Sequence, residues 1–395
     1  MPKVVIILGI GAFINAVGNS FVWPLNSLFM HDVLGKTLTE AGLVIALQSA
    51  LALSGQFLSG YLADKIGARR LMLWGLVLAS LTVGLIGVFP VWSVYVPAII
   101  FLGLTQALIF VPLNALISIL WPAGERRGFN YLYVAVNAGV AIGTALGGLV
   151  AQYSFRLVFL SNAVTFLLYL VVVLYGIPKD VQPGQDRVET KFNWHGIVSD
   201  FGFKTLVSLC LGIFFVWTAY IQMTTILPIV MTNRGFSLAS YSVLWTINGA
   251  CIVLLQPLVS WAIRVWVYTF PRQFLVGSGL MVGAFVILLR ISAYQGYVVS
   301  IILLTLGEML ILPAVPTVAA RLAPPGREGL YQGAVAGMAS GGRMMGPLLG
   351  GALFDRGGGS ATWYLAVGFL LGAMMVFLLY RSHENILARQ INIGA

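Results

Sequence analysis

Two ionisable side chains stand inside long apolar stretches of this sequence, where they could carry out proton chemistry. Glu308 lies in the apolar stretch 296–320, and Arg343 lies in the stretch 329–354. An ionisable residue within a bilayer is costly and usually functional. A carboxyl group in a low dielectric favours its protonated form, so Glu308 could load a proton on one side of a membrane and release it on the other. We therefore expect proton coupling through Glu308, assisted by Arg343 and by Asp64 at the end of an earlier stretch.

Two other roles for Arg343 are open at this point. It could form a structural ion pair with Glu308, which would need good geometry to offset the desolvation of both charges. It could also bind an anionic substrate.

Amide and aromatic side chains recur at helical spacing within the apolar stretches. Asn15 and Asn19 are four residues apart, and Trp217 and Tyr220 are three apart, so each pair lies on one helix face. Aromatic rings offer apolar area and cation–π contacts, which suits large amphipathic substrates. Packing between helices is the alternative for each residue. The candidate cavity residues are Asn15, Asn19, Trp23, Gln106, Asn114, Trp217, Tyr220, Trp245, Asn248 and Glu308.

The composition requires lipid as the outer solvent. Of the 395 residues, 59% are hydrophobic and 9% are charged, whereas soluble domains carry about 25% charged residues. We therefore expect the formal charge of +10 to mark the cytoplasmic side of a membrane and not a nucleic-acid partner. Cys210 and Cys251 both lie in apolar stretches, so no disulfide framework is expected.

Apolar stretches of about 20 residues are long enough to cross the hydrocarbon as helices. The sequence contains twelve such stretches, at 4–30, 39–63, 71–89, 94–120, 128–152, 157–177, 204–231, 237–263, 273–290, 296–320, 329–354 and 361–380. We therefore expect an all-α integral membrane protein with an N-terminal six-helix bundle (1–177), a cytoplasmic linker (178–203) and a C-terminal six-helix bundle (204–395). Most of the 22 Lys and Arg residues fall on the side of the N-terminus, which predicts that both termini are cytoplasmic.

A ladder of glycines occurs twice, about half the chain apart. Its copies start at Gly139 and Gly342, an offset of 203 positions (342 − 139). Small residues four apart let membrane helices pack closely. Such a repeat in an apolar chain indicates a duplicated helical bundle, and duplicated bundles of this kind are mostly transporters. The helix-packing residues are Gly139, Gly143, Gly147 and Gly148 in the first copy, and Gly342, Gly346, Pro347, Gly350 and Gly351 in the second.

The segment from Gly60 to Arg70 reads Gly-Tyr-Leu-Ala-Asp-Lys-Ile-Gly-Ala-Arg-Arg and lies between the second and third expected spans. It resembles the loop signature of the major facilitator superfamily, with Ala68 where that family usually has a basic residue. The resemblance implies twelve helices in two pseudo-symmetric six-helix bundles. It also implies that Asp64 latches the cytoplasmic gate at the start of the eleventh span, near Glu328. A solvated, basic turn is the alternative. The gating motif would comprise Gly60, Asp64, Lys65, Gly67, Arg69 and Arg70.

The glycine ladder is similar to the antiporter motif of the drug/proton antiporter branch of that family. Thr144 replaces the motif's proline in the first copy, and Pro347 keeps it in the second. The resemblance implies export of lipophilic compounds in exchange for protons.

The segment Thr305-Leu-Gly-Glu308 is similar to the tenth span of multidrug/proton antiporters. The same resemblance places Asn137 in the substrate cavity. Leu132 and Thr224 stand where those proteins carry acids, so proton coupling would fall mainly on Glu308.

No nucleotide-binding loop or hydrolase motif is found, and His31, His195 and His383 are isolated from one another. We therefore expect no enzyme activity, no metal and no cofactor, with the proton gradient as the energy source. The expected partners are a small lipophilic substrate, protons and membrane lipid, for a monomer in a bacterial plasma membrane.

The sequence thus predicts a proton-coupled secondary transporter that exports drug-like compounds by rocker-switch alternating access. Three alternatives remain: a lipid or glycolipid flippase of the same fold, a proton-coupled importer of a small solute, and a receptor or scaffold that transports nothing.

Overall fold

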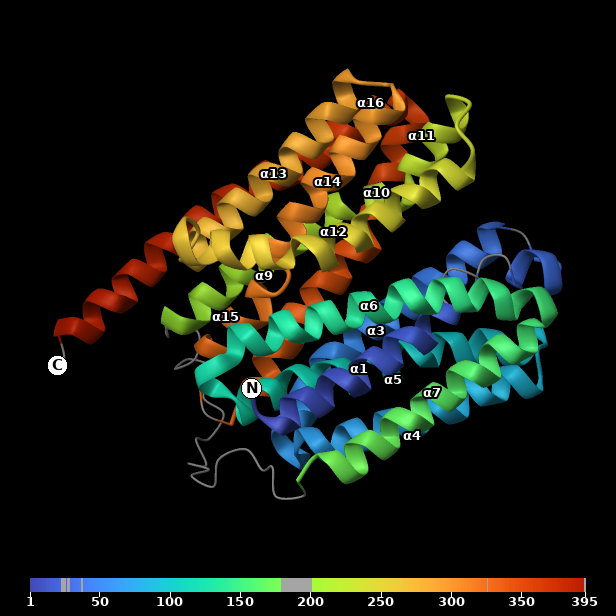
Figure 1. The fold of residues 1–395 in the computed structure, drawn as a ribbon, viewed down its shortest axis with the longest axis horizontal. Coiled ribbons are helices and arrows are strands. Elements are labelled where there is room, and N and C mark those ends of the chain that lie inside the picture. The colour runs from blue at the N-terminus through green and yellow to red at the C-terminus, as the bar shows by residue number, and fades with distance from the viewer. Residues whose placement is uncertain (23–25, 27–28, 37, 179–200, 325, 394–395) are drawn as a thin grey trace. The chain divides into compact units, whose positions relative to one another are not determined.

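The structure is a computed structural model that describes residues 1–22, 26, 29–36, 38–178, 201–324 and 326–393 (Figure 1). Trp23 and most of the expected linker lie outside the described residues. Every regular element in the described part of the chain is helical. A chain in hydrocarbon requires this, because a helix satisfies its own backbone hydrogen bonds. The expected all-α membrane fold is confirmed.

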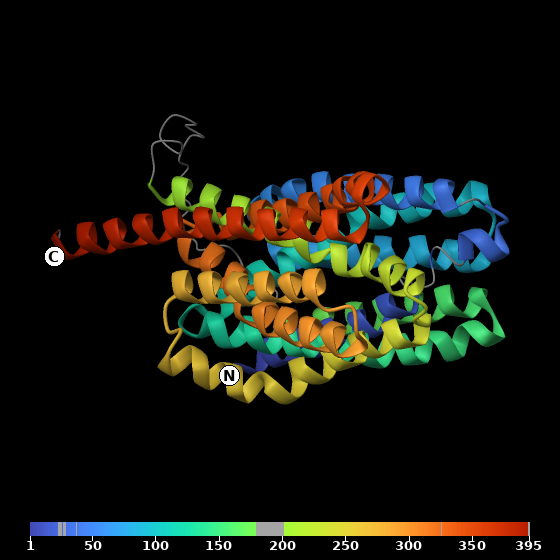
Figure 2. The same cartoon turned by 90° about the horizontal axis from the view of Figure 1, so that it is seen from above.

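The described chain divides into two compact units, of which the first comprises Met1–Arg187 and Ala323–Gly337. Its elements are α1 (Lys3–Val22), a π-helical turn η2 (Phe29–Val33), α3 (Leu38–Ile66), α4 (Ala68–Val88), α5 (Trp92–Leu120), a short 3₁₀ turn η3 (Pro122–Gly124), α6 (Glu125–Tyr153) and α7 (Phe155–Gly176). Helix α1 packs against α6 and α7, and α5 packs against α3 and α4. Figure 2 shows the same helices from a second direction. These contacts run along the helices and form the core of the unit.

The second unit comprises Val188–Leu322 and Met338–Ala395. Its elements are α9 (Phe201–Tyr220), α10 (Gln222–Thr225), α11 (Leu227–Asn233), α12 (Leu238–Val265), α13 (Phe270–Arg290), α14 (Tyr294–Ile311), α15 (Ala314–Leu322) and α16 (Glu328–Ile393). The first turns of α16 belong to the first unit. Gly358 interrupts α16 with a φ of 66° and a ψ of −165°, so α16 consists of two helical segments.

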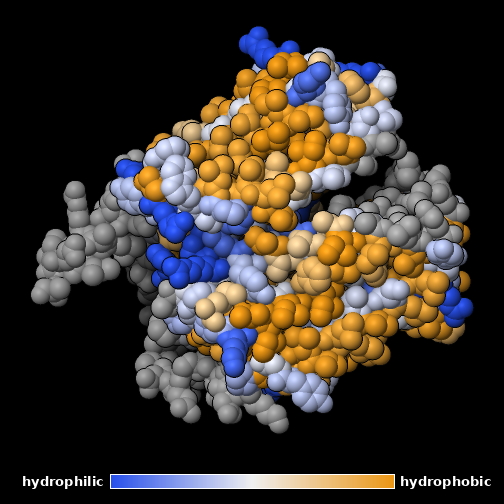
Figure 3. All heavy atoms as spheres, in the orientation of Figure 1, coloured by the Kyte–Doolittle hydropathy of each residue, from blue (hydrophilic) through white to orange (hydrophobic). Residues whose placement is uncertain are grey.

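Ten segments of the described chain are long and apolar enough to cross a membrane. The last of them, Glu328–Leu379, contains the eleventh and twelfth expected spans on either side of Gly358. Helix α6 occupies the fifth expected span. Together these helices account for the twelve expected stretches. Apolar side chains cover much of the helix surface, as contact with lipid requires (Figure 3).

Two of the expected spans are interrupted and are not single helices. The stretch 204–231 consists of α9, α10 and α11, and the stretch 296–320 consists of α14 and α15. Pro228 lies in the first turn of α11, and Pro313 lies between α14 and α15. Proline has no N–H group and its ring clashes with the preceding turn, which interrupts the helix. Pro112 is nevertheless contained within α5, so proline alone does not decide where a helix ends.

The two glycine ladders make equivalent contacts, each within its own unit. A Cβ atom on Gly139 would lie 2.6 Å from the carbonyl oxygen of Phe13 on α1, and a Cβ atom on Gly342 would lie 2.5 Å from the carbonyl oxygen of Phe214 on α9. Real side chains do not approach backbone atoms this closely. Each glycine therefore lets two helix backbones touch, which small residues permit in membrane helices.

The remaining ladder positions are less uniform. A side chain would also clash with a neighbouring helix at Gly143, Gly147, Gly346 and Gly350. Gly351 has open space around it, and Pro347 lies within α16 without ending it. The surroundings of Gly148 lie outside the described part of the structure.

The packing of the ladders can be tested with single methyl groups. Gly139→Ala and Gly342→Ala should each destabilise the protein by about 1–3 kcal/mol, because the added carbon has no space between the backbones. Thermal unfolding in detergent would measure the loss. Gly279→Ala on α13 is the control, because a Cβ atom there meets nothing within 4 Å. It should leave the unfolding midpoint unchanged or raise it. Equal midpoints for all three variants would contradict the close packing.

Candidate functional site

Glu308 is buried on α14, five residues before the helix break at Pro313, and is 3% exposed. Asn248 on α12 donates through Nδ2 to Thr305 Oγ1 at 2.8 Å and to Glu308 Oε1 at 3.4 Å. Tyr220, at the end of α9, lies close enough to the Glu308 carboxyl group for the two side chains to interact electrostatically. Two other helices of the second unit, α12 and α9, therefore bring polar groups close to this one acid.

A chain of aromatic rings leads away from Glu308. The ring centroids of Tyr220 and Trp217 are 5.1 Å apart, and those of Tyr220 and Trp245 are 6.3 Å apart, both with edge-to-face geometry. Tyr241 extends the chain beyond Trp245, at 6.4 Å. Trp217, Tyr220 and Trp245 are half-buried, so part of each ring remains accessible. The rings form an apolar platform beside a buried acid.

Helical periodicity explains why these residues converge. Residues three positions apart lie on the same face of a helix. Four helices each contribute one such pair: Trp217 and Tyr220 on α9, Trp245 and Asn248 on α12, Thr305 and Glu308 on α14, and Ser340 and Arg343 on α16. Packing of the four helices in one unit then brings the four faces together.

Arg343 lies at the Trp217 end of this series of aromatic rings. Its Nη2 donates to Ser340 Oγ at 2.7 Å, and its guanidinium group lies 4.5 Å from the centre of the Trp217 ring. A guanidinium over a tryptophan face is a favourable cation–π arrangement. Among the described residues no ion pair joins Arg343 to Glu308. The structural ion pair considered from the sequence is therefore not formed.

The candidate amides of the first unit meet only in part. Gln106 Nε2 on α5 donates to Asn19 Oδ1 on α1 at 2.7 Å, and Asn19 Nδ2 donates back at 3.4 Å. Asn114 is buried elsewhere on α5, and its backbone carbonyl accepts from the Ser118 hydroxyl. The structure thus joins Asn19 to Gln106 and leaves Asn114 apart from them.

Two other amides of this unit point to local partners or to none. Asn137 donates through Nδ2 to the carbonyl oxygen of Tyr133 on its own helix, at 2.9 Å. The side-chain oxygen of Asn15 is buried without a hydrogen-bond partner among the described residues. Trp23, the remaining candidate on this side, lies outside the described part of the chain.

Asp64 binds the beginning of α16 within the first unit. The N–H groups of Gly329 and Leu330 donate to Asp64 Oδ1 and Oδ2, at 2.7 and 2.8 Å. A carboxylate at a helix N-terminus satisfies unpaired N–H groups and is favoured by the helix dipole. The approach is close because Gly60 has no side chain: a Cβ atom there would lie 2.5 Å from the carbonyl oxygen of Gly329.

The other residues of the Gly60–Arg70 motif each have different surroundings. Gly67 adopts a φ of 93°, a conformation that favours glycine, and lets α4 begin directly after α3. Arg69 donates to the carbonyl oxygens of Leu174 and Ile177, both at 3.0 Å, and so caps the carboxyl end of α7. The Lys65 ammonium lies 5.8 Å from the Tyr61 ring, and Arg70 is exposed.

Two members of these clusters were not among the predicted site residues. Ser340 and Thr305 position Arg343 and Asn248, and each lies three residues before a site residue on its own helix, a spacing that could have identified it. The binding of Arg69 to the end of α7 had no local signal, because more than 100 residues separate the partners.

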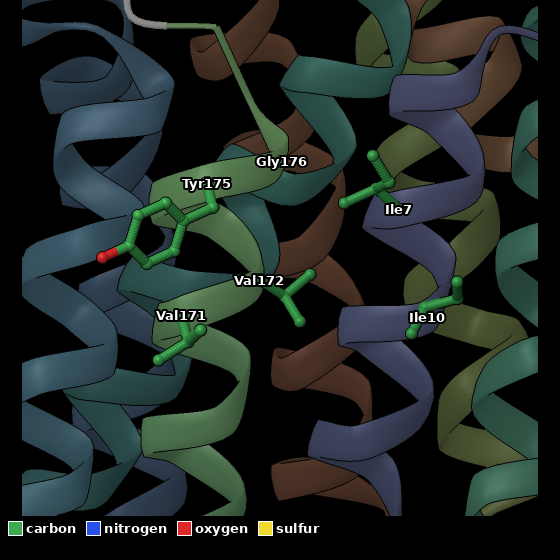
Figure 4. A pocket seen from close by; sticks show the side chains of 6 residues that line it. All are labelled: Ile7, Ile10, Val171, Val172, Tyr175 and Gly176. Carbon is green, nitrogen blue, oxygen red and sulfur yellow. The ribbon is translucent and has the colours of Figure 1, made fainter.

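A shallow apolar groove of about 330 Å³ lies between α1 and α7, far in sequence from the acid and its platform. Its lining is shown in Figure 4 and consists of Ile7, Ile10, Val171, Val172, Tyr175 and Gly176. None of the predicted site residues contributes to it. Its almost purely aliphatic lining suits contact with hydrocarbon and offers little that could orient a polar ligand.

Comparison with known proteins gives consistent results. The sequence model of the Major Facilitator Superfamily matches residues 8–338 and 266–390. The chain is 41% identical over 382 residues to the "Uncharacterized MFS-type transporter YttB" of Bacillus subtilis (strain 168), covering 96% of each protein. It is 25% identical over 403 residues to the "Quinolone resistance protein NorA" of Staphylococcus aureus (strain MSSA476), covering 99% of this chain and 100% of that one.

A solved structure has the same fold. The human organic anion transporter MFSD10 (TETRAN) superposes with a TM-score of 0.76 at 14% identity, covering 95% of this chain and 100% of that chain. At this identity the likeness concerns the fold alone.

The binding of Asp64 to α16 predicts an order of stabilities. Asp64→Asn keeps one oxygen acceptor without the charge, and Asp64→Ala keeps neither. The unfolding midpoint should fall from wild type to Asn to Ala, with each lost charge-assisted hydrogen bond costing about 1.5–3 kcal/mol. Asp355→Ala is the control, because Asp355 is an exposed acid on the same helix. Identical midpoints for Asp64→Ala and wild type would contradict the capping role.

Proposed function

Because the chain belongs to the Major Facilitator Superfamily, whose members are carriers and not enzymes, we propose a specific mode for this multi-pass membrane transporter. It exports lipophilic, amphipathic compounds in exchange for protons, by alternating access. The observation that carries the proposal is the buried Glu308, which accepts a hydrogen bond from Asn248 and lies close to Tyr220, beside a partly accessible aromatic platform.

The position of Glu308 supports a role in proton coupling. A carboxyl group in a low-dielectric site is costly to ionise, so it binds a proton readily when water reaches it from the acidic side. The hydroxyl group of Tyr220 and the amide of Asn248 can donate to the ionised form. The neighbouring helix break at Pro313 lets this part of the unit rearrange more easily than an unbroken helix would. Protonation state and conformation can thereby be linked.

The aromatic platform supports a lipophilic substrate. Trp217, Tyr220 and Trp245 present rings from two helices and remain partly accessible. Rings bind apolar and cationic compounds without strict geometric demands. The 25% identity to the quinolone resistance protein NorA over nearly the full length of both chains also favours drug export.

The exchange cycle follows from competition at one acid. In the state open to the cytoplasm, ionised Glu308 attracts the substrate and Trp217 and Trp245 hold its apolar body. In the state open to the outside, a proton neutralises Glu308 and the substrate is released. The hydrogen bonds from the start of α16 to Asp64 would stabilise one of the two states, as the gating motif of the family implies.

We place both termini on the cytoplasmic side of a bacterial plasma membrane, following the distribution of Lys and Arg. The transporter works as a monomer, driven by the proton gradient without a cofactor. Its partners are the lipophilic substrate, protons and the surrounding lipid.

The proposal predicts the behaviour of Glu308→Gln in liposomes. Acid-inside vesicles containing the wild-type protein should accumulate fluorescent aromatic dyes from a panel of cationic, neutral and amphoteric compounds. Glu308→Gln should lower this uptake by about tenfold or more, the size of typical coupling energies. Dye exchange without a pH difference should persist, because glutamine keeps the shape of the site.

Two controls make this measurement decisive. Glu40→Gln removes an acid of the first unit that is ion-paired with Lys36, and it should transport like wild type. Protein-free vesicles give the baseline for passive dye entry. Uptake that is equal for Glu308→Gln and wild type would contradict the coupling role, and uptake only into vesicles with acid outside would indicate an importer.

A further inference from the structure

We infer that one end of α12, α13 and α15 in the second unit binds the headgroup of an anionic phospholipid, whose acyl chain lies along α12. The site, which we call the basic aromatic patch, consists of Trp261, Arg264, Trp266, Tyr268, Arg272 and Arg321. The inference goes beyond the proposed function, because neither Glu308 nor any ring of the aromatic platform belongs to the patch.

The patch lies where two membrane spans end. The apolar spans Val243–Val265 and Phe270–Arg290 are joined by residues 266–269. Trp266 and Tyr268 in this connection are 67% and 61% exposed. Tryptophan and tyrosine are enriched at the level of the lipid headgroups, because each combines an apolar ring with a polar group. The connection is therefore placed where a headgroup can reach it.

The arginines of the patch have no acidic neighbour on their own helices. Between Leu238 and Leu322, the stretch that forms α12 to α15, Glu308 is the only Asp or Glu residue, and it is buried in α14. Arg264 and Arg272 are exposed, and among the described residues they form no ion pair and no side-chain hydrogen bond. Their positive charge therefore attracts anionic lipid at the membrane surface.

Two guanidinium groups stack on aromatic rings in a way that suits a phosphate. Arg272 lies 4.6 Å from the centre of the Tyr268 ring, and Arg321 lies 4.9 Å from the centre of the Phe270 ring. Because a ring covers only the flat face of a guanidinium group, the N–H donors of Arg272 remain directed outward in its plane. A planar fork of donors binds two phosphate oxygens side by side. The contact with Phe270, the first residue of α13, brings Arg321 to the same end of the unit.

An apolar stripe on α12 leads to the patch. Leu254, Leu258, Trp261 and Val265 follow one another at intervals of four, three and four residues, so they lie on one helix face. All four side chains are exposed. The Trp261 ring contacts the Trp266 ring, with centroids 5.0 Å apart. An acyl chain along this face would bring its phosphate to the end of α12 where the arginines lie.

The equivalent connection in the first unit uses its charges within the protein. It joins α3 to α4, the second and third expected spans, as residues 266–269 join the eighth to the ninth. There Asp64 accepts hydrogen bonds from the start of α16, and Arg69 donates to the end of α7. The connection between α12 and α13 contains no acid, and Arg264 and Arg272 make no such bond in the described part of the chain. Their charges are thus available to an external anion.

The test measures how well the protein distinguishes anionic from zwitterionic phospholipid. Purified full-length protein in neutral detergent is titrated with phosphatidylglycerol or phosphatidylcholine whose acyl chains carry bromine, which quenches tryptophan fluorescence on contact. Half-maximal quenching should need an about tenfold lower concentration of phosphatidylglycerol, as expected for arginines that act at a membrane surface. Trp261→Phe combined with Trp266→Phe should remove most of the quenching that is selective for phosphatidylglycerol.

Variants assign the selectivity to single arginines. Arg264→Gln and Arg272→Gln should each lower the preference for phosphatidylglycerol by about fivefold, and Arg272→Lys should keep most of it. Arg290→Gln is the matched control, because Arg290 is an exposed arginine at the opposite end of α13. It should leave the preference unchanged. All of these side chains are exposed, so the variants should unfold at the wild-type midpoint in lipid-free detergent.

Three results would overturn the inference. The first is equal quenching of the wild-type protein by both lipids. The second is an equal loss of preference in Arg290→Gln and Arg272→Gln, which would indicate a general attraction to positive charge. The third is displacement of phosphatidylglycerol by inorganic phosphate but not by chloride of the same ionic strength, which would make free phosphate the ligand. None of these measurements requires transport, so their outcome is independent of the role of Glu308.

Discussion

The absence of water around the helices is the constraint on which this structure depends. Hydrocarbon offers no hydrogen bonds, so the described chain folds into helices that satisfy their own backbone groups. The same constraint makes each charge within a span expensive, and it explains why Glu308 and Arg343 are surrounded by hydroxyl, amide and ring groups. The helix breaks near Pro228 and Pro313 follow α9 and α14, the helices that carry Tyr220 and Glu308.

Both units pack their helices through glycines that touch a neighbouring backbone, and they differ in the polar and aromatic side chains that the helices carry. Gly139 meets the backbone of α1 as Gly342 meets the backbone of α9, atom for equivalent atom. On this shared scaffold the first unit places a neutral amide pair, Asn19 with Gln106, whereas the second places an acid, an arginine and three aromatic rings. A duplicated scaffold thus leaves one half free to specialise in charge, because glycine packing depends on backbone shape and makes no demand on the other helix faces.

The contact between Asp64 and α16 joins two segments 265 residues apart in sequence. It works through backbone N–H groups, so the identity of the side chains at Gly329 and Leu330 matters only in leaving room for the approach. Gly60 provides that room on the other side. A strong interaction of this kind, made by one carboxylate with a helix end, can be broken as a unit when the helix end moves.

The sequence by itself determined the membrane fold, the positions of the apolar stretches, the paired glycine ladders and the i, i+3 faces that carry Trp217, Tyr220 and Glu308. These features depend on composition and on residue spacing within single helices, and both can be read from the sequence. Only the tertiary structure decided that Arg343 lies over Trp217 and forms no ion pair with Glu308, and that Arg69 caps α7. It also decided that Asn19 meets Gln106 while Asn137 bonds within its own helix. Such partners depend on how helices distant in sequence are rotated and shifted along their axes relative to one another. A rotation or shift by the equivalent of one residue points a side chain toward a different neighbour.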